Sequence, residues 1–450
     1  MSRILAINEI AKLNANTFKK DEFPNIVKYL DTSNLTKNQI QKLQKFNVKN
    51  DNLPSRAQRK VKQNTILYST VRPNQEHFGI IEKILNNIVV STGFTTIDVF
   101  DNSISPKFLY FLLTQKHITD YLHTIASNSV SAYPSISPND IGELKFKFPE
   151  LEVQKKIASV LSSLDDKIEL NNRINAELER MAKTVYDYWF VQFDFPISAA
   201  YAASVGQPEL EGKPYKSSGG KMVWSEELKR EVPEGWEVMR IKEIAVTGSG
   251  GTPLSSTPKF YENGNIPWIN SGEVNAPFII NAKKFITQDG LNNSSAKLFP
   301  RGTILMAMYG ATAGQVSLID IEACTNQAIC FIIPKDKKLT EYIKFSLHQL
   351  YEYLVKLSSG SARDNLSQDK IKDLHILIPN SIVVERFHQI CHNTFEKTLF
   401  NLKESQKLTE LRDWLLPMLM NGQVKVGDVE DEEMMGMAAE GMEAYKVRGE

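Results

Sequence analysis

The chain has 450 residues, and its 53 lysines and arginines balance 53 aspartates and glutamates, so its formal net charge is zero. This length predicts two to four domains, and no apolar run is long enough to span a membrane. The neutral total argues neither for nor against a nucleic-acid partner. Three cysteines, none in a CxxC pair, give no metal or disulfide framework and predict a protein of the reducing cytoplasm: Cys324, Cys330 and Cys391.

Residues 1–150 are predicted to form a globular domain of mixed α/β structure. Within this domain, the stretch from Lys42 to Lys62 carries seven lysines and arginines against a single acidic residue, Asp51. The neutral total of the chain therefore hides a local cationic surface.

A long amphipathic helix is predicted over residues 151–193. No Gly or Pro occurs from Glu150 to Val191, and apolar residues recur at spacings of three and four. Such rows are typical of a coiled-coil seam, which needs a partner helix. Asparagines interrupt both rows. The rows are Ile157, Leu164, Asn171, Leu178 and Val185, and Leu161, Ile168, Asn175, Ala182 and Trp189.

Four further segments are predicted after this helix. Residues 194–233 form a linker, residues 234–380 a second globular domain, and residues 381–426 a second long helix. The last segment, 427–450, is rich in acidic residues and is predicted to be disordered.

The second domain and its helix repeat the first pair. A shift of 230 residues places Ser127–Pro149 over Leu357–Pro379 without a gap. Helix periodicity alone aligns any two amphipathic helices, but the matches outside the helices have no such origin. These are the "SA" pairs, Ser137 with Ser367, and Pro149 with Pro379. The same register gives the second seam Phe387, Asn401, Leu408 and Leu415, and a weaker match sets "NTILYSTVR" against "GTILMAMYG".

The two helices are predicted to pair as an antiparallel coiled coil with pseudo-two-fold symmetry. A helix of about 36 residues is ~54 Å long, and a parallel pair would require the linker to return that full length. Two interpretations of the seam asparagines stay open. They fix the register across the pair, Asn171 with Asn401, at some cost in stability, or they face solvent at a frayed edge of the seam.

Two similar domains on a helical spacer suit a ligand with two sites at a fixed separation, such as duplex DNA with half-sites ~34–36 Å apart. Lys and Arg neutralise phosphates, and Arg and Gln also pair with base edges. The polar loop Thr247–Val274 offers backbone and hydroxyl donors. Tyr133 and Arg363 are matched positions with different chemistry, as expected for domains that read different half-sites. The candidate DNA-binding residues are Arg56, Gln58, Arg59, Lys60, Lys62, Arg72, Tyr133, Ser249, Thr252, Lys259, Tyr309 and Arg363.

The sequence contains only incomplete versions of known catalytic motifs. The stretch "NIPW" (Asn265–Trp268) lacks the Pro-Pro of an adenine-methyltransferase motif, and "GSGG" (Gly248–Gly251) does not open a helix. The carboxylates of "PNDIGELK" (Pro138–Lys145) are too close in sequence for a nuclease metal site. "HQICH" (His388–His392) places two histidines one helical turn apart, but without the Glu of HExxH it is interpreted as helix surface or seam. The sequence therefore predicts no catalytic and no metal-binding residue.

Taken together, these features resemble the specificity (S) subunits of type I restriction–modification enzymes. The resemblance covers the chain to about Val426 and is carried by the two-copy layout and three phrases. The phrases are "FPELEVQKKIASVLSSLDDKIELNNRINAELERMAKTVYDYWFVQFDFP", "GKPYKSSGGKMVWSEELKREVPEGWEV" and "GGTPLSSTPKFYENGNIPWINSGEV".

The resemblance implies two target-recognition domains, each reading one half of an asymmetric bipartite DNA sequence, with the helix pair setting the distance between the halves. It implies that the chain has no active site and no cofactor of its own. Two modification subunits would methylate adenine with S-adenosylmethionine, and two restriction subunits would move and cleave DNA with ATP and Mg²⁺.

Two alternatives are an enzyme and a non-catalytic scaffold or stand-alone DNA-binding protein. An enzyme is disfavoured by the missing motifs, and methylation by the chain alone would support it. A two-headed structural scaffold, or a stand-alone DNA-binding protein, fits the layout as well. Salt-dependent binding to duplex DNA would separate DNA recognition from a scaffold.

Overall fold

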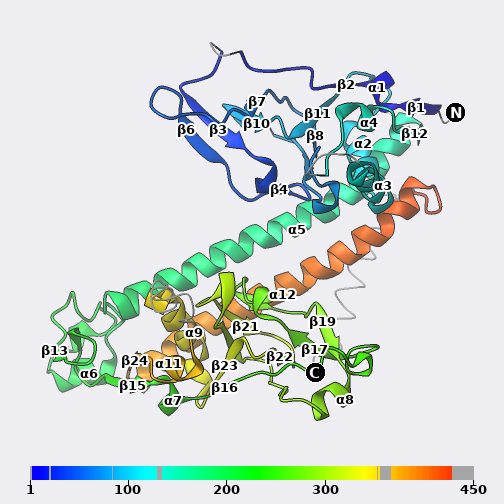
Figure 1. Cartoon of the computed structure of the whole chain (residues 1–450). Helices are drawn as coiled ribbons and strands as arrows, with labels where there is room; N and C mark the ends of the chain where they lie inside the picture. Colours follow the sequence, from blue (N-terminus) through cyan, green and yellow to red (C-terminus); the bar gives the residue numbers. More distant parts are fainter. Residues whose placement is uncertain are drawn as a thin grey trace. The chain divides into compact units, whose positions relative to one another are not determined.

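The computed structural model describes residues 3–19, 22–83, 85–128, 134–351, 353–354 and 366–427 (Figure 1). The candidates Tyr133 and Arg363, the matched "SA" pairs and residues 428–450 of the acidic segment lie outside the described residues. The chain divides into two compact units, which are described one at a time. Unit 1 is Met1–Lys167 with Leu408–Glu450, and unit 2 is Ile168–Lys407.

The strands of unit 1 form two four-stranded sheets and two short pairs. The sheets have the orders β2-β11-β8-β9 and β6-β3-β10-β7, and the pairs are β1-β12 and β4-β5. The strands are β1 (Arg3–Ala6), β2 (Ala11–Leu13), β3 (Ile26–Leu30), β4 (Leu35–Thr36), β5 (Gln39–Ile40), β6 (Gln44–Asn47), β7 (Ala57–Arg59), β8 (Ile66–Ser69), β9 (Phe78–Ile80), β10 (Ile88–Ser91), β11 (Phe94–Val99) and β12 (Lys145–Phe148).

Short helices complete the core of unit 1. Helix α2 begins after Ser105, whose hydroxyl accepts a hydrogen bond from the Phe108 amide, and Pro106 occupies its first turn, where no amide donor is needed. All side chains from Phe108 to Leu113 are buried. The helices and 3₁₀ turns are α1 (Ile7–Ile10), α2 (Pro106–Leu113), α3 (Lys116–Ser127), α4 (Pro138–Gly142), η1 (Thr32–Asn34) and η2 (Pro73–Gln75).

Unit 2 contains a five-stranded sheet of order β16-β23-β20-β21-β18 and a three-stranded sheet of order β19-β17-β22, besides the pairs β13-β14 and β15-β24. Its strands are β13 (Met222–Ser225), β14 (Arg230–Pro233), β15 (Glu237–Arg240), β16 (Ala245–Ser249), β17 (Ile266–Ile269), β18 (Phe278–Ile279), β19 (Lys284–Ile286), β20 (Ile304–Ala307), β21 (Val316–Ile319), β22 (Cys324–Thr325), β23 (Ile329–Pro334) and β24 (His375–Ile378). Its short helices are α6 (Ala199–Ser204), α7 (Ile241–Ile244), α8 (Gln288–Asn292), α9 (Thr340–Gln349) and α11 (Gln368–Lys372), and its 3₁₀ turns are η4 (Pro208–Leu210), η5 (Pro258–Phe260), η6 (Ser271–Glu273), η7 (Gly310–Thr312) and η8 (Lys337–Leu339).

The two units repeat one topology. The order β2-β11-β8-β9 corresponds to β16-β23-β20-β21, and β6-β3-β10 corresponds to β19-β17-β22. Even the strand directions agree, because β3 with β10 and β17 with β22 are both parallel pairs. The duplication predicted from the sequence is confirmed. Strand β7 in unit 1 and strand β18 in unit 2 are additions to the shared plan.

Residues matched by the 230-residue shift have the same structural roles in the two units. Ser137 caps α4 by accepting a hydrogen bond from the Asp140 amide, and Ser367 caps α11 by accepting one from the Lys370 amide. One turn later, Ile141 and Ile371 are both fully buried. The sequence match outside the long helices therefore reflects a repeated cap and a repeated core contact.

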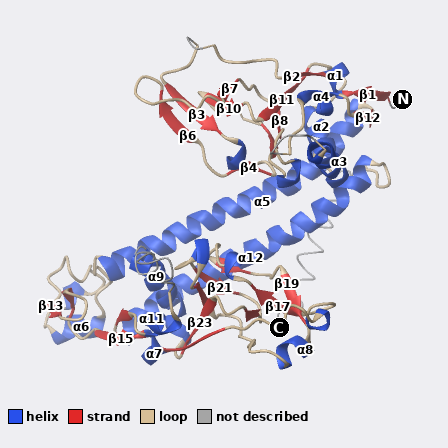
Figure 2. Ribbon diagram, in the orientation of Figure 1, coloured by secondary structure: helices blue, strands red, loops and turns tan. Residues whose placement is uncertain are grey.

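Helices α5 (Leu151–Tyr186) and α12 (Ser381–Met420) are the longest elements of the chain, whereas the strands, red in Figure 2, are short. Helix α5 continues into a π-helical turn, η3 (Asp187–Val191). The fourteen seam residues predicted from the sequence, ten in the first helix and four in the second, are all buried or half-buried. Among the described residues, no helix is long and apolar enough to cross a membrane.

Within unit 2, the two helices run antiparallel with a polar layer in their seam. The Asn171 amide donates to the Glu404 carboxylate at 2.7 Å, to the Ser405 hydroxyl at 3.2 Å and to the Asn401 carbonyl at 3.5 Å. The Asn401 amide in turn donates to the Asn175 side chain at 2.8 Å. Asn171 is 1% exposed and Asn401 2%. The asparagines therefore join the helices, and the interpretation in which they face solvent is wrong.

Within unit 1, the other ends of the two helices also pack on each other. Arg412 forms an ion pair with Asp165 at 2.7 Å, and both side chains are largely buried. Leu419 belongs to the same apolar core as Ile157 and Leu161 of α5. The C-terminal end of α12 therefore completes the core of the unit that contains the N-terminal domain.

Residues 194–233, predicted as a linker, are folded in unit 2. They contain α6 and the β13-β14 hairpin. Phe195 stacks between Tyr215 and Trp236, with ring centroids 4.6 and 5.0 Å apart. The aromatic residues of this stretch, which the sequence analysis did not use, supply the core that holds it in place.

Candidate nucleic-acid interface

Strand β7 presents the first group of candidate DNA-binding residues as the last strand of its sheet, where it pairs with β10 on one side and bridges to Thr17 through Arg59 on the other. Ala57 of this strand is buried, whereas Gln58, which follows it, is exposed, as alternation along a strand requires. Arg56 is exposed just before the strand. The Gln58 amide donates to the Ser55 carbonyl at 2.7 Å, which leaves its oxygen and a second hydrogen for a ligand. Arg56 and Gln58 are therefore well placed for contacts with base edges.

Two neighbours of these residues are occupied within the protein. The Lys60 ammonium pairs with Glu22 at 2.6 Å and lies 4.9 Å from the centre of the Phe18 ring. Its hydrogen bond lowers the pKa of the Glu22 carboxyl. Arg59 is half-buried, burial lowers the pKa of its guanidinium, and it contacts the Thr17 hydroxyl at 3.5 Å. Arg59 and Lys60 thus hold the segment around Phe18 against β7.

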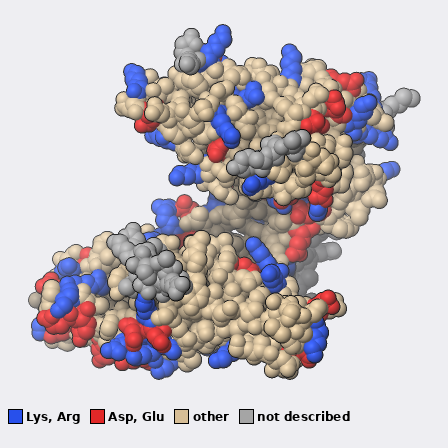
Figure 3. All heavy atoms as spheres, in the orientation of Figure 1, with Lys and Arg blue, Asp and Glu red and all other residues tan. Residues whose placement is uncertain are grey.

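The rest of the basic stretch is exposed. Lys42, Lys45, Lys49 and Lys62 lie on the surface, and among the described residues none of them has an acidic partner within 4 Å. Lys45 belongs to β6, which is the opposite edge of the sheet from β7. In the face that Figure 3 draws, the Lys and Arg side chains of unit 1 are dispersed over the surface. Such dispersed cations suit contacts along a phosphate backbone rather than one compact anion.

Arg72 and Tyr309 occupy equivalent places in the two units. Each is the residue before a 3₁₀ turn that follows a central strand, η2 after β8 in unit 1 and η7 after β20 in unit 2. Both residues are exposed. The matched stretches "NTILYSTVR" and "GTILMAMYG" bring Arg72 and Tyr309 within one position of each other, and the 3₁₀ turns that follow them complete the correspondence. The same place in the fold therefore carries a cation in one unit and an aromatic ring in the other.

The polar loop of unit 2 is only partly available to a ligand. The amides of Gly250 and Gly251 donate to the carbonyls of Ile329 and Thr325. A Cβ atom at Gly250 would lie 2.1 Å from the Thr325 carbonyl oxygen, and one at Gly251 would lie 2.3 Å from the Ser295 backbone. These glycines are needed for close backbone packing, and their amides are not free donors.

The exposed part of this loop begins just after the glycines. Ser249 is half-buried on β16, and Thr252 is exposed but bonded to the Gln327 side chain. Lys259 is exposed, with its ammonium 5.5 Å from the centre of the Phe260 ring. Residues 252–259, with Pro253 buried among them, form the surface that a ligand of this loop would meet.

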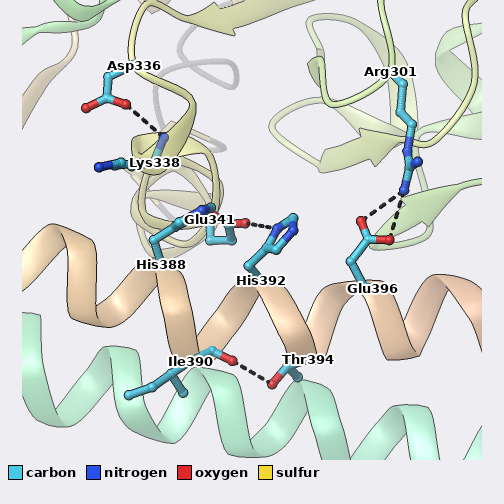
Figure 4. Close-up of polar contacts among 9 residues, drawn as sticks. All are labelled: Arg301, Asp336, Lys338, Glu341, His388, Ile390, His392, Thr394 and Glu396. Atoms are coloured by element: carbon cyan, nitrogen blue, oxygen red, sulfur yellow. Dashed lines mark hydrogen bonds and ion pairs between the residues drawn. The ribbon is translucent and has the colours of Figure 1, made fainter. Parts of the chain in front are cut away.

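The histidines of "HQICH" are not seam residues. His388 and His392 project from α12 toward α9, where both contact Glu341 (Figure 4). No signal in the sequence pointed to Glu341, because it lies 47 residues before His388 in a different helix.

The comparisons with known proteins follow the same division of the chain. The model of the type I restriction modification DNA specificity domain matches residues 3–180 and 233–404, which is more than half of the chain. The chain belongs to this family. Each match of the specificity-domain family covers one set of sheets and most of the long helix that follows it.

Two relatives support this family assignment, and a solved structure has a similar fold. The chain is 31% identical to the type I restriction enzyme HindI specificity subunit of Haemophilus influenzae, over 93% of this chain and 98% of that protein. It is 26% identical to the MjaIX specificity subunit of Methanocaldococcus jannaschii, over 81% and 78% of the two chains. The crystal structure of a type I restriction–modification S subunit from M. genitalium has a similar fold, with a TM-score of 0.55, 16% identity and coverage of 93% and 96%.

Proposed function

We propose that this chain is the DNA sequence-specificity subunit of a type I restriction–modification complex. Each sheet-containing domain reads one half of an asymmetric bipartite target in double-stranded DNA, and the paired helices set the distance between the halves. The chain supplies recognition, and partner subunits supply the chemistry.

The observation that carries this proposal is the repetition of one topology with different exposed side chains. Arg72 and Tyr309 stand at equivalent places. Among the described residues of unit 2, no strand corresponds to β7, which contains Gln58 and directly follows Arg56. A guanidinium pairs with guanine edges or phosphates, whereas a phenol ring packs on a thymine methyl or donates one hydrogen bond. Two like folds with unlike recognition groups suit a target whose halves differ in sequence.

The length and register of the long helices support their role as a spacer. Helices of 36 and 40 residues extend ~54 and ~60 Å, more than one turn of duplex DNA. The buried asparagines fix the register of the pair in unit 2, since a slip would leave buried amides without partners. A fixed register gives a fixed spacing.

Exposed apolar residues on the helices support docking of two like partners. Leu170 and Phe400 are matched by the 230-residue shift and are 42% and 55% exposed, and the matched pair Met181 and Leu411 are 60% and 43% exposed. Apolar side chains repeated on two helical surfaces suit two copies of one protein. We propose that they receive two modification subunits, which use S-adenosylmethionine, and that two restriction subunits, which use ATP and Mg²⁺, join this complex. The localisation we propose is cytoplasmic.

Sequencing of methylated DNA tests the proposal. Cells would express the chain with a compatible modification subunit, and single-molecule sequencing would map methyladenine. We expect a new bipartite motif that is absent when this chain is omitted. A single contiguous motif would contradict recognition by two domains. No new methylation from a complex that assembles would contradict the role in modification.

A further inference from the structure

Three side chains that can bind metals converge in unit 2. His388 and His392 are one turn apart on α12, so their imidazoles lie on the same face of the helix. Glu341 is in the first turn of α9. Its carboxylate oxygens lie 2.8 Å from Nδ1 of His388 and 3.3 Å from Nδ1 of His392. Figure 4 shows the three groups pointing toward one another from the two helices.

The carboxylate is the buried member of the group. The side chain of Glu341 is 5% exposed, that of His388 22% and that of His392 50%. Among the described residues, the two imidazoles are the partners of this carboxylate. A buried carboxylate needs a cation or strong hydrogen-bond donors near it, and a metal ion at this position would supply that cation.

The spacing fits one ion. Donor atoms from all three residues lie within 4.8 Å of one another. Atoms bound to one ion at about 2.0–2.1 Å are about 3.3–3.5 Å apart at tetrahedral angles, so small side-chain movements would bring these donors into place. Two imidazoles and one carboxylate are the protein ligands of several zinc sites that keep a fourth position for water. Hard cations such as Ca²⁺ and Mg²⁺ prefer sets made only of oxygen.

We infer that Glu341, His388 and His392 bind one divalent transition-metal ion of the Zn²⁺ class. The ion would join α9, which packs against the sheet of unit 2, to the long helix α12. The half-exposed His392 gives the ion a route from solvent and leaves a position for water. Cys391 is adjacent in sequence, but its fully buried thiol is not in the group of donors. The site would therefore have nitrogen and oxygen ligands without sulfur.

A metal titration of the full-length chain, untagged and pretreated with a chelator, tests this inference. Calorimetry with Zn²⁺ should give one strong site per chain, and Co²⁺ should give a visible spectrum without a thiolate-to-cobalt band. Zn²⁺ should also raise the unfolding temperature, because it binds the folded chain preferentially. The substitutions Glu341→Gln and His392→Asn should each weaken binding about 100-fold or more and abolish both effects.

Two further comparisons separate loss of metal binding from loss of any histidine and from misfolding. His375→Asn removes an exposed histidine of the same unit, at the start of β24, and should bind Zn²⁺ like the wild type. His392→Asn changes a half-exposed side chain, so it should keep the wild-type circular dichroism even if Glu341→Gln does not fold. Wild-type protein without strong Zn²⁺ binding would overturn the inference and leave a hydrogen-bonded cluster. Binding that persists in a folded His392→Asn variant would overturn it equally.

Discussion

Lys344 shows how one side chain can make the stability of unit 2 depend on pH. It is 5% exposed on α9, and its ammonium lies 4.9–5.5 Å from the ring centres of Phe278, Phe345 and Phe395. Burial lowers its pKa from 10.5 to about 8, although the charge of Glu179 acts in the opposite direction. Because the folded-state pKa is the lower one, the folded chain is most stable relative to the unfolded chain above pH 10.5, and this advantage is lost as the pH falls toward 8.

We predict that Lys344→Met changes this profile. The pKa difference corresponds to a change of about 3 kcal/mol in the free energy of unfolding between pH 10.5 and pH 7. Attraction between the ammonium and the aromatic rings would reduce this change. The free energy of unfolding of the variant minus that of the wild type should therefore fall as the pH rises from 8 to 10.5. Urea unfolding followed by tryptophan fluorescence measures this difference, with Lys337→Met as the exposed control. A difference that is constant over this range would contradict the prediction.

Single residues also mark the limit of inference from sequence. The run of positive charge around Arg59 and Lys60 was visible in the sequence, but their engagement with Thr17, Phe18 and Glu22 was not. Those partners lie about 40 residues earlier and carry no motif. The same reason hid Glu341, since the sequence shows only the helical spacing of the two histidines.

At the scale of elements, the long helices were the most predictable part of the fold. Uninterrupted spacing of apolar residues predicted a helix over 151–193, and the 230-residue repeat predicted a second one over 381–426. The structure has α5 with η3 over 151–191 and α12 over 381–420. The strands could not be placed in sheets in this way, because runs of two to six residues do not identify their neighbours. The fold of 194–233 was missed because its glycines and serines are typical of a linker.

The polar layer between α5 and α12 gives a prediction at this scale. Asn175 and Asn401 share a side-chain hydrogen bond of 2.8 Å. Asn175→Ala and Asn401→Ala should each cost about 1–2 kcal/mol of unfolding free energy, and the double variant should cost less than the sum by about 1 kcal/mol. A double-mutant cycle by urea unfolding measures this coupling.

Asn172 is the control for this cycle, because it is exposed on the same helix next to Asn171. Asn172→Ala should change the unfolding free energy by less than about 0.5 kcal/mol. Additive costs for Asn175→Ala and Asn401→Ala would show that the bond does not join the helices in solution.

At the scale of the whole molecule, two recognition domains should be separable by mutation. Arg56→Ala with Gln58→Ala should relax the sequence preference in one half of the methylated motif by about 1–3 kcal/mol for each lost base contact. Tyr309→Ala should relax only the other half. Lys62→Ala, as a phosphate-contact control, should weaken binding for all sequences alike. Sequencing of methylated DNA reports all three, and a change of both halves by one variant would contradict independent reading.

The two-copy architecture of the molecule could be predicted because an internal duplication is detectable as similarity between two parts of the sequence. The shift of 230 residues, the caps Ser137 and Ser367, and the matched asparagines identified two copies before any sheet was placed. The 230-residue shift does not extend to Arg72 and Tyr309, because the loops between the matched segments differ in length, but the weaker match of "NTILYSTVR" with "GTILMAMYG" brings them within one position of each other.

Unit 1 combines two segments that are far apart in the sequence, and this affects its folding during synthesis. Its core contains Ile157 and Leu161 as well as Leu419, with Leu415 and Leu416 packed against it. The ribosome synthesises the first part of this unit some 240 residues before the last part, which takes roughly 10–50 s at bacterial and eukaryotic elongation rates. During that interval the apolar side of α5 is without its helical partner. A nascent chain therefore carries an unfinished first unit until α12 emerges, and chains that terminate before α12 would expose this surface to chaperones and proteases.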